Sequence, residues 1–352
     1  MIDSVVGMPP KPLFWAPPLA LALSLSGCGG GGGPTSPGTA PTPSVPTYSV
    51  MATVFYDQNR NGQLDPGENT RVPGVDVVIG PGTGKSAPGT GQAVVSGVTE
   101  GPQSVALRTD SLPAYFQPES QLSVQVPAAS EVRIPLTLPI GDNHANLYLG
   151  FGDSITYGDG STDRQGYVIK LQNLLGAHFG RAEVRSWGRP GTVSVEGARK
   201  TRETLRWYDP AYVLILYGTN DWHDQQCQGK PASSCYTIEA LRDMIEDIKD
   251  WDSLPVLATI PPVNPTKAPE GRNRWYDDMN VQIKALAQQQ QVVLCDMNAE
   301  FKAQPNMAAL YSDDVHPNDA GYQLMAQAWF KAITRGRAQA AGAGPRFGFS
   351  LF

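Results

Sequence analysis

Alternating apolar and polar positions dominate residues 48–140 of the chain. Short segments rich in β-branched residues are separated by Gly- and Pro-rich turns, and they cover 48–55, 75–79, 104–107, 122–126 and 132–136. Period-two alternation over such short runs is typical of half-buried β-strands. Residues 48–140 are therefore predicted to form a small all-β sandwich.

The pattern changes at residue 141, where apolar strands begin to alternate with amphipathic helices. The predicted strands are 147–151, 184–187, 212–217, 256–260 and 292–296. Between them, apolar residues recur three or four positions apart, as at Ile238, Leu241 and Ile245, and a last helix is predicted over 319–334. This alternation predicts an α/β fold over residues 141–336, with a flavodoxin-like doubly wound parallel sheet.

Both ends of the chain differ from these two regions. Residues 13–25 hold an apolar stretch that is too short to span a bilayer as a helix but is typical of an export signal. Residues 28–47 are rich in Gly, Pro, Ser and Thr, a composition that cannot bury apolar surface and predicts a semi-extended linker. The Gly- and Ala-rich residues 337–352 predict a disordered tail.

The apolar stretch ends in Leu25-Ser26-Gly27-Cys28, which resembles the lipobox of bacterial lipoproteins. The resemblance implies that residues 1–27 are a signal peptide and that Cys28 becomes acylated. It also implies an exported lipoprotein, held by this lipid at the outer membrane or cell surface. Residues 1–10 carry no positive charge, but translation from Met8 would place Lys11 near the start. A plain secretory signal is the alternative.

Charge and cysteine content restrict the partners and the compartment. The chain has 27 Lys and Arg against 33 Asp and Glu, a net charge of -6, so no basic stripe for a nucleic-acid backbone is expected. Cys295 lies in an apolar run and is expected to be a buried thiol. Cys227 and Cys235 flank a short polar loop, and an extracytoplasmic location favours a disulfide between them. Two free thiols are the alternative.

Four polar blocks follow predicted strands or precede the last helix. They are Gly152-Asp153-Ser154, Gly188-Arg189-Pro190-Gly191, Gly218-Thr219-Asn220-Asp221 and Asp313-Asp314-Val315-His316. Reactive groups of an open α/β sheet lie at the carboxyl ends of its strands, where such blocks would meet. A serine becomes a nucleophile when an imidazole takes its proton, and a carboxylate fixes the imidazole tautomer. The blocks contain all three groups.

In order and position, these blocks resemble those of the SGNH (GDSL-like) hydrolases. The resemblance implies that Ser154 is the nucleophile and His316 its base. It also implies that Asp313 orients the imidazole, because the family spacing is Asp-x-x-His, although Asp314 is nearer in sequence. No cofactor is expected for catalysis.

The same resemblance implies an oxyanion hole. Its donors would be the backbone N–H groups of Ser154 and Gly191 and the side-chain amide of Asn220. Glycine suits position 191 because the chain must pass close to the substrate there. The family usually carries Asn five residues before this glycine, where the present chain has Ser186.

The implied function is serine-dependent hydrolysis of short-chain or carbohydrate acyl esters, acetyl esters above all, by a monomer outside the cytoplasm. Polar and aromatic residues near the blocks favour a small-molecule or polysaccharide ester over a long acyl chain; they are Tyr157, Trp187, Trp222, His223, Arg272, Trp275 and Tyr276. One alternative is a lysophospholipase or thioesterase that acts on longer acyl chains. An alternative of another class is an inactive surface adhesion or glycan-binding module, which the intact blocks disfavour.

Residues 57–68 form a second candidate site. Oxygen-bearing side chains at loop positions 1, 3, 5, 9 and 12, Gly at position 6 and a backbone carbonyl at position 7 reproduce an EF-hand calcium loop. The ligands would be Asp57, Asn59, Asn61, Gln63, Asp65 and Glu68. The flanking segments predict strands, so the loop resembles that of calcium-binding B-type β-sandwich repeats of bacterial surface proteins. A structural calcium ion of modest affinity is expected, and a turn without metal is the alternative.

Overall fold

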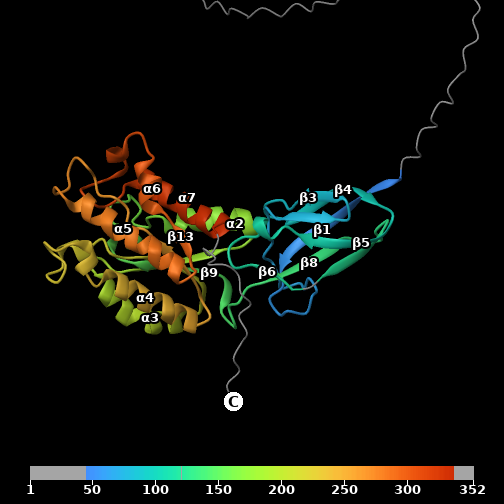
Figure 1. The fold of residues 1–352 in the computed structure, drawn as a ribbon, viewed down its shortest axis with the longest axis horizontal. Coiled ribbons are helices and arrows are strands. Elements are labelled where there is room, and N and C mark those ends of the chain that lie inside the picture. The colour runs from blue at the N-terminus through green and yellow to red at the C-terminus, as the bar shows by residue number, and fades with distance from the viewer. Residues whose placement is uncertain (1–44, 120, 337–352) are drawn as a thin grey trace, which may run out of the picture. The chain divides into compact units, whose positions relative to one another are not determined.

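The computed structural model describes residues 45–119 and 121–336 of the 352-residue chain (Figure 1). The predicted signal peptide, the lipidation site at Cys28, the linker up to residue 44 and the predicted tail lie outside the described residues. Among the helices of the described ranges, none is both long and apolar enough to cross a membrane.

Within the described residues, the N-terminal region is an all-β fold of eight strands in the order β6-β8-β1-β4-β3-β2-β5-β7. Strand β1 pairs antiparallel with β4 and parallel with β8. Val54, Val77 and Val95 are fully buried in one core, as period-two alternation requires. The strands are β1 (Thr47–Tyr56), β2 (Asp76–Ile79), β3 (Gly82–Lys85), β4 (Gln92–Thr99), β5 (Gly101–Leu107), β6 (Gln117–Pro118), β7 (Leu122–Val126) and β8 (Val132–Thr137).

The sequence-based prediction missed β3, β4 and the short β6, and glycine explains the case of β3. A Cβ at Gly82 would lie 2.6 Å from the Ser96 carbonyl oxygen, and one at Gly84 would lie 2.5 Å from the Val94 carbonyl oxygen. The two strands therefore approach too closely for any larger residue at positions 82 and 84 of β3. Glycine has a low β-propensity, so the glycines that this contact requires remove the pattern of apolar residues by which the strand could have been predicted.

The C-terminal region contains the predicted parallel sheet. Within residues 144–295, which the structure describes throughout, five parallel strands lie in the order β10-β9-β11-β12-β13. Numbered along the chain, this order is 2-1-3-4-5, so the flavodoxin-like doubly wound fold is confirmed. The strands are β9 (His144–Gly152), β10 (Glu183–Gly188), β11 (Pro210–Leu216), β12 (Leu254–Ala258) and β13 (Val293–Cys295).

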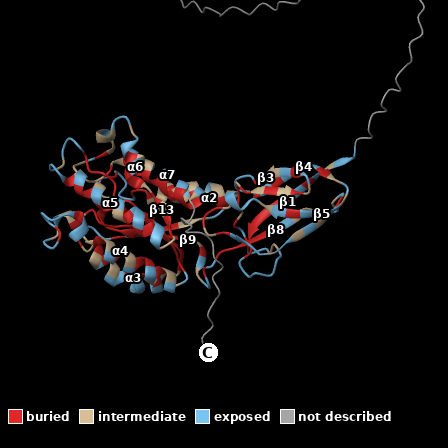
Figure 2. Ribbon diagram, in the orientation of Figure 1, coloured by how far each residue is buried: buried red, intermediate tan, exposed pale blue. Residues whose placement is uncertain are grey.

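Helices cover both faces of this sheet. Tyr212 and Leu214 of β11 belong to a cluster with α2 and α7, whereas Val213 and Ile215 belong to a cluster with α4 and α5. Side chains of a strand alternate between faces, so a strand covered on both sides is apolar throughout. Every residue of β11 is buried, and Figure 2 shows the centre of the α/β region as buried. The helices are α1 (Ser154–Tyr157), α2 (Val168–Phe179), α3 (Ser194–Tyr208), α4 (Thr237–Asp250), α5 (Arg272–Gln289), α6 (Met297–Lys302) and α7 (Asp319–Arg335).

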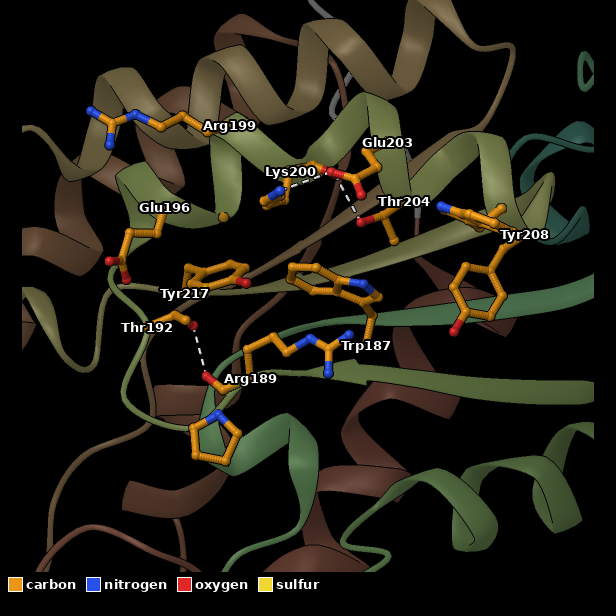
Figure 3. A pocket seen from close by; sticks show the side chains of 13 residues that line it. Trp187, Arg189, Thr192, Glu196, Arg199, Lys200, Glu203, Thr204, Tyr208 and Tyr217 are labelled. Carbon is orange, nitrogen blue, oxygen red and sulfur yellow. Dashed lines mark hydrogen bonds and ion pairs between the residues drawn. The ribbon is translucent and has the colours of Figure 1, made fainter.

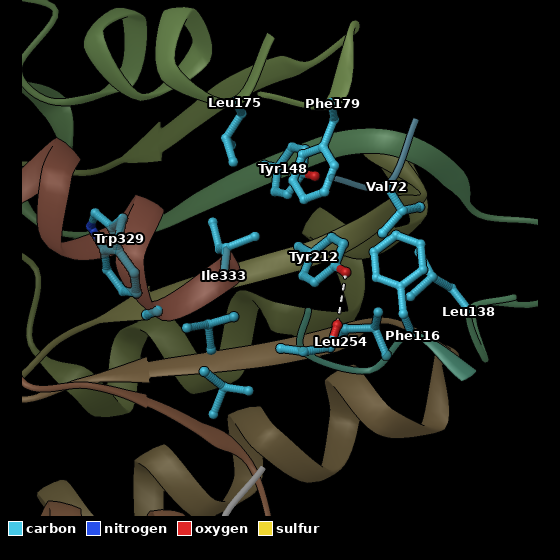
Figure 4. Close-up of a cluster of buried hydrophobic side chains, with 14 of the residues drawn as sticks. Val72, Phe116, Leu138, Tyr148, Leu175, Phe179, Tyr212, Leu254, Trp329 and Ile333 are labelled. Carbon is cyan, nitrogen blue, oxygen red and sulfur yellow. Dashed lines mark hydrogen bonds between the residues drawn. The ribbon is translucent and has the colours of Figure 1, made fainter. Parts of the chain in front are cut away.

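One hydrophobic cluster continues from the β-region into the α/β region (Figure 4). Phe116 stacks on Phe179 of α2 with ring centroids 6.2 Å apart. The Tyr115 hydroxyl donates to the Pro255 carbonyl oxygen at 2.6 Å and accepts from the Val293 N–H at 3.2 Å. Pro255 and Val293 lie where β12 and β13 begin, so these contacts leave the opposite, carboxyl ends of the parallel strands free for chemistry.

Candidate active site

Ser154 is presented by a tight turn at the carboxyl end of β9. The turn needs Gly152, because a Cβ there would lie 2.3 Å from the Thr156 hydroxyl and 2.5 Å from the Leu216 carbonyl oxygen. Asp153 then caps α1 by accepting a hydrogen bond from the Ile155 N–H at 3.0 Å. Ser154 is the first residue of α1 and is 7% exposed. The turn thus fixes the backbone on both sides of the hydroxyl.

The structure brings Ser154, His316 and Asp313 into one hydrogen-bonded line. Ser154 Oγ lies 2.9 Å from His316 Nε2, and His316 Nδ1 lies 2.7 Å from Asp313 Oδ2. The other carboxylate oxygen of Asp313 accepts from the backbone N–H groups of Val315 at 2.8 Å and His316 at 2.6 Å. Ser154 and His316 are 162 residues apart in sequence, so the fold alone creates their contact.

The Asp313 carboxyl is held in its ionised form. Partial burial acts to raise its pKa, but hydrogen bonds from the His316 ring and from the His316 and Val315 N–H groups outweigh burial and lower the pKa. Asp314 faces elsewhere, since its Oδ2 pairs with Arg272 Nη1 at 3.2 Å. The adjacent carboxylates therefore have different partners, and Asp313 is the one that contacts the imidazole.

Two backbone donors face no competing acceptor. Among the described residues, no hydrogen bond uses the N–H of Ser154 or of Gly191. Gly191 has a φ of 78°, a left-handed conformation that favours glycine. Space is not the constraint there, since a Cβ would meet nothing within 4 Å. Gly188 differs, because a Cβ there would lie 2.1 Å from the Tyr157 nitrogen. Gly188 thus serves packing, and Gly191 presents its N–H.

The Asn220 amide completes this group of donors. Its Nδ2 donates to the Thr192 carbonyl oxygen at 2.9 Å and lies 3.5 Å from Asp153 Oδ2. One amide hydrogen therefore fixes the side chain on the Gly191 loop, while the long second contact leaves the other hydrogen free to turn toward a substrate oxygen. Asp221, fully buried, anchors the same loop by accepting from Ser194 and Thr237.

Comparison with known proteins agrees with this arrangement. Residues 151–324 match the GDSL-like lipase/acylhydrolase family. The α/β part of this chain is thus similar to the GDSL-like hydrolases. No curated protein matches the chain.

Solved structures of similar fold include several esterases and lipases. A lipase/acylhydrolase from Enterococcus faecalis is 20% identical with a TM-score of 0.45, covering 56% of this chain and 100% of its own. A GDSL-like lipase from Bacteroides thetaiotaomicron is 20% identical with a TM-score of 0.43, covering 53% and 87%. An acetylxylan esterase from Geobacillus stearothermophilus is 22% identical with a TM-score of 0.45, covering 56% and 96%.

Ser186 occupies the position where GDSL-like hydrolases usually carry Asn. Its hydroxyl donates to the Thr156 carbonyl oxygen at 3.0 Å and accepts from the Gly188 N–H at 3.2 Å. These contacts connect the end of β10 to α1, beneath the turn that presents Ser154. The serine therefore supports the backbone of the GDSL-like site and is not aimed at the position of a substrate oxygen.

A chain of contacts from α5 connects two of the four blocks. Arg272, 3% exposed, pairs with Asp314 and donates from Nε to the Tyr276 hydroxyl at 2.9 Å. That hydroxyl donates to the Thr219 carbonyl oxygen at 2.7 Å. The loop with Asp313 and His316 is thereby fixed against the loop with Asn220. From the sequence, Arg272 and Tyr276 were named only as polar and aromatic residues near the blocks; their spacing of four places both on one face of α5.

The cysteines of the GDSL-like domain lie as expected. Cys227 and Cys235 form a disulfide, and Cys295 is a buried free thiol. The disulfide closes the loop that follows Trp222 and His223. Trp222 packs edge-on against Trp275 with ring centroids 5.9 Å apart, and His223 is exposed. The disulfide therefore braces a loop that begins directly after Asn220 and Asp221.

In the candidate calcium loop, the carboxylates accept backbone N–H groups of the loop itself. Asp57 Oδ2 accepts from Gly62 at 2.6 Å, while Glu68 accepts from Gln58 at 2.7 Å and from Asp65 at 3.0 Å. The Asn59 and Asn61 amides both donate to Asp65 at 2.8 Å. Across the described ranges, no group of three or more His, Cys, Asp or Glu side chains is placed to hold a metal ion. Any ion here must also be bound by amide and carbonyl oxygens.

Removal of the Asn220 amide should slow the chemical step. The Asn220→Ala variant is expected to lose about a hundredfold to a thousandfold in kcat, because one donor to the developing oxyanion is lost. KM should change little, since the donor acts mainly in the transition state. Steady-state hydrolysis of p-nitrophenyl acetate measures both constants. Asn220→Asp is a control that should lose at least as much, and equal kcat in wild type and Asn220→Ala would remove Asn220 from the oxyanion hole.

The buried Asp153 predicts a pH-dependent stability. Burial raises the pKa of Asp153 to about 7. The hydrogen bond from the Ile155 N–H acts to lower this pKa, and the nearby Asp221 carboxyl adds a smaller increase. The folded state thus binds the proton more tightly than the unfolded state, whose carboxyl titrates near about 4. Its contribution to stability is full below about pH 4 and is lost as pH rises through about 7.

The test compares unfolding free energies in urea at pH 5 and pH 8. From pH 5 to pH 8, the unfolding free energy of wild type should fall by on the order of 1–3 kcal/mol more than that of Asp153→Asn, because the amide cannot ionise. The Asn side chain keeps an oxygen that accepts from the Ile155 N–H. Identical pH dependence in both proteins would show that the Asp153 carboxyl does not titrate in this range.

Proposed function

We propose that the protein is a serine-dependent carboxylic ester hydrolase that acts on short-chain or carbohydrate acyl esters, acetyl esters above all. The observation that carries the proposal is the line from Ser154 Oγ through His316 to Asp313, with contacts of 2.9 Å and 2.7 Å. This is the arrangement that raises the nucleophilicity of a serine hydroxyl. The unengaged N–H groups of Ser154 and Gly191 supply the second requirement of acyl transfer.

The proposed reaction has two steps. Ser154 Oγ attacks the ester carbonyl while His316 Nε2 takes the hydroxyl proton, and Asp313 steadies the imidazolium. The carbonyl oxygen becomes an oxyanion that accepts hydrogen bonds from Ser154 N, Gly191 N and Asn220 Nδ2. His316 returns the proton to the departing alkoxide, which leaves an acyl-serine and an alcohol. A water molecule, deprotonated by His316, then releases the carboxylic acid and regenerates Ser154.

Polar surroundings support a small acyl group joined to a polar alcohol. Arg189 and Pro190 are exposed beside the oxyanion donor Gly191, and the exposed His223 lies within electrostatic range of Arg272 and Asp314. A long acyl chain would need a mainly apolar channel. Charged groups at these positions favour a hydroxyl-rich alcohol instead.

A chain-length series tests this substrate class. For p-nitrophenyl esters from acetyl to palmitoyl, kcat/KM should be highest at acetyl and fall with length. Acetate should also be released from acetylated polysaccharide. A maximum of kcat/KM at long acyl chains would favour the lysophospholipase or thioesterase alternative. Absence of hydrolysis for every ester would favour a binding module.

We further propose that the loop of residues 57–68 binds a structural calcium ion. The support is electrostatic: Asp57 is fully buried and Glu68 is 6% exposed, yet neither takes part in an ion pair of the described residues. Two buried carboxylates without a cationic partner fit a bound cation. The ligands would be Asp57, Asn59, Asn61, Gln63, Asp65 and Glu68.

Thermal unfolding with calcium and with chelator tests this site. Calcium should raise the Tm of wild type and should not raise that of the Asp57→Asn, Glu68→Gln double variant. Substitution of the same two side-chain types outside the loop, at Asp110 and Glu100, is the matched control and should leave the calcium effect intact. An equal Tm with calcium and chelator would contradict the proposal.

We also propose that the protein is exported and anchored through acylated Cys28. The disulfide between Cys227 and Cys235 supports an oxidising compartment outside the cytoplasm. Incorporation of labelled palmitate should occur in wild type and vanish in Cys28→Ala. Label retained by Cys28→Ala, or absent from wild type, would contradict the lipid anchor.

A further inference from the structure

A pocket of about 1020 Å³ lies between α3 and the end of β10, next to the proposed catalytic site (Figure 3). One side of α3 lines it through positions that recur three or four residues apart, from Glu196 through Arg199 and Glu203 to Trp207. Trp187, Arg189 and Tyr217 line the pocket from the sheet side, and none of these side chains belongs to the catalytic line.

The pocket reaches the oxyanion loop. Arg189, Pro190 and Thr192 line it, and these residues flank Gly191 on both sides. The Thr192 carbonyl oxygen also accepts the hydrogen bond that fixes Asn220. A ligand that fills the pocket would therefore end beside the loop that carries Gly191.

The dimensions fit an extended ligand. The lining positions run along most of α3, a helix of 15 residues, and such a helix is about 22 Å long. A compact ligand such as a single acetylated monosaccharide would use only a small part of this length. The shape favours a linear chain of several units that lies along the helix.

Aromatic side chains provide flat contact surfaces along this path. Trp207 is 79% exposed, the largest exposed fraction among the large hydrophobic residues of the described chain, and Trp187 and Tyr208 are half-buried. Tyr217 also lines the pocket but is only 1% exposed. Exposed and half-buried aromatic rings are flat surfaces on which sugar rings can stack, so they suit a saccharide.

The charges of the pocket indicate an acidic ligand. Its two carboxylates are engaged, since Glu196 accepts from the Val193 N–H at 3.1 Å and Glu203 pairs with Lys200 at 2.9 Å. Arg189 lies over the Trp187 ring at 4.8 Å, and neither Arg189 nor Arg199 takes part in an ion pair of the described residues. Two guanidinium groups are thus left for anionic groups of a ligand, and guanidinium binds carboxylates well. An acyl chain would leave these charges unpaired.

We propose that this pocket binds an extended acidic oligosaccharide, one that carries uronic-acid carboxylates, as the alcohol part of the ester substrate. The proposal rests on the proposed esterase function and adds the substrate class of that site. Trp207 and Trp187 stack on sugar rings, and Arg199 and Arg189 pair with carboxylates. The ester-bearing unit then lies beside Gly191.

Binding to the full chain with Ser154→Ala tests the pocket without turnover. Calorimetry should show that oligogalacturonate binds at least about tenfold tighter than a xylo-oligosaccharide of equal length, with an affinity that falls as salt rises. Arg199→Gln and Trp207→Ala should each weaken oligogalacturonate binding by about tenfold. Arg206→Gln is the matched control, because Arg206 is exposed on α3 but does not line the pocket.

Kinetics separate failure of this proposal from failure of the esterase. With intact Ser154, Arg199→Gln and Trp207→Ala should keep wild-type kcat/KM on p-nitrophenyl acetate and lose about tenfold on acetylated oligogalacturonate. Equal affinity for acidic and neutral saccharides, or variants that match Arg206→Gln on both measures, would overturn the acidic-saccharide site. Wild type inert toward p-nitrophenyl acetate would overturn the proposed function, and with it the substrate role of the pocket.

Discussion

Replacement of Ser154 by alanine is expected to lower kcat for p-nitrophenyl acetate by about a millionfold. The substitution removes the one oxygen that lies 2.9 Å from His316 Nε2, so no acyl-serine can form. Binding should persist, because the N–H of residue 154 and the other oxyanion donors remain. Stopped-flow or steady-state release of p-nitrophenolate, corrected for background, measures the loss.

The same experiment needs evidence that the fold survives. Ser154 is nearly buried and loses only its hydroxyl, so the Tm of Ser154→Ala should stay close to wild type. Ser186→Ala is the matched control: it removes a serine hydroxyl that bonds to the Thr156 carbonyl oxygen and not to His316. The control should keep most of its activity, and a Ser154→Ala variant as active as this control would exclude Ser154 as nucleophile.

Replacement of Asp313 by asparagine is expected to cost about ten-thousandfold in kcat. The Asn amide would donate to His316 Nδ1, so Nε2 would carry the ring hydrogen and could not accept the Ser154 proton. The contact of 2.7 Å between Asp313 Oδ2 and His316 Nδ1 is the basis of this expectation. The ratio of kcat in wild type to kcat in Asp313→Asn is measured on p-nitrophenyl acetate, at a pH where wild type is fully active.

Asp314→Asn is the control for Asp313. It removes the same charge one residue away, from a side chain that pairs with Arg272. The kcat of Asp314→Asn should fall by less than about tenfold, because this substitution can act only indirectly, through the position of the loop. If Asp314→Asn lost as much as Asp313→Asn, the carboxylate that orients His316 would have to be reassigned.

The sequence predicted the doubly wound sheet because each of its strands is covered on both faces. Leu214 and Ile215 point to opposite clusters, and this need for apolar residues on both sides is visible as a continuous apolar run. Strand β3 shows the limit of such patterns. Gly82 and Gly84 are required by the backbone of β4, a contact between segments that the local sequence does not encode.

The candidate site shows a similar division. The positions of Ser154, Asn220 and His316 were predictable, because their blocks resemble those of the SGNH hydrolases in order and position, and two of these blocks follow predicted parallel strands. The chain of contacts from Arg272 and Tyr276 to the two catalytic loops was not, since it depends on where α5 begins relative to loops 42 and 57 residues away in sequence. Burial of Asp153 likewise follows from packing around a turn, not from its tripeptide.

The pocket along α3 follows from the fold in the same way. Trp207 lies on a helix whose polar positions are ordinary for a surface helix, and only the placement of β10 at the sheet edge leaves room beside it. The loop that joins β10 to α3 contains Gly191, so one connection serves both the oxyanion donor and the pocket wall. The two proposals therefore predict that substrate preference and chemistry can be altered separately, at Arg199 and at Ser154.

Covalent labelling tests the central claim, that Ser154 is the nucleophile, most directly. The protein would be incubated with a fluorophosphonate, and its mass would be measured intact and after digestion. We expect stoichiometric loss of esterase activity together with an adduct on the peptide that contains Ser154, and no adduct in Ser154→Ala. An adduct on another residue, or undiminished activity in protein that is fully labelled at Ser154, would contradict the account.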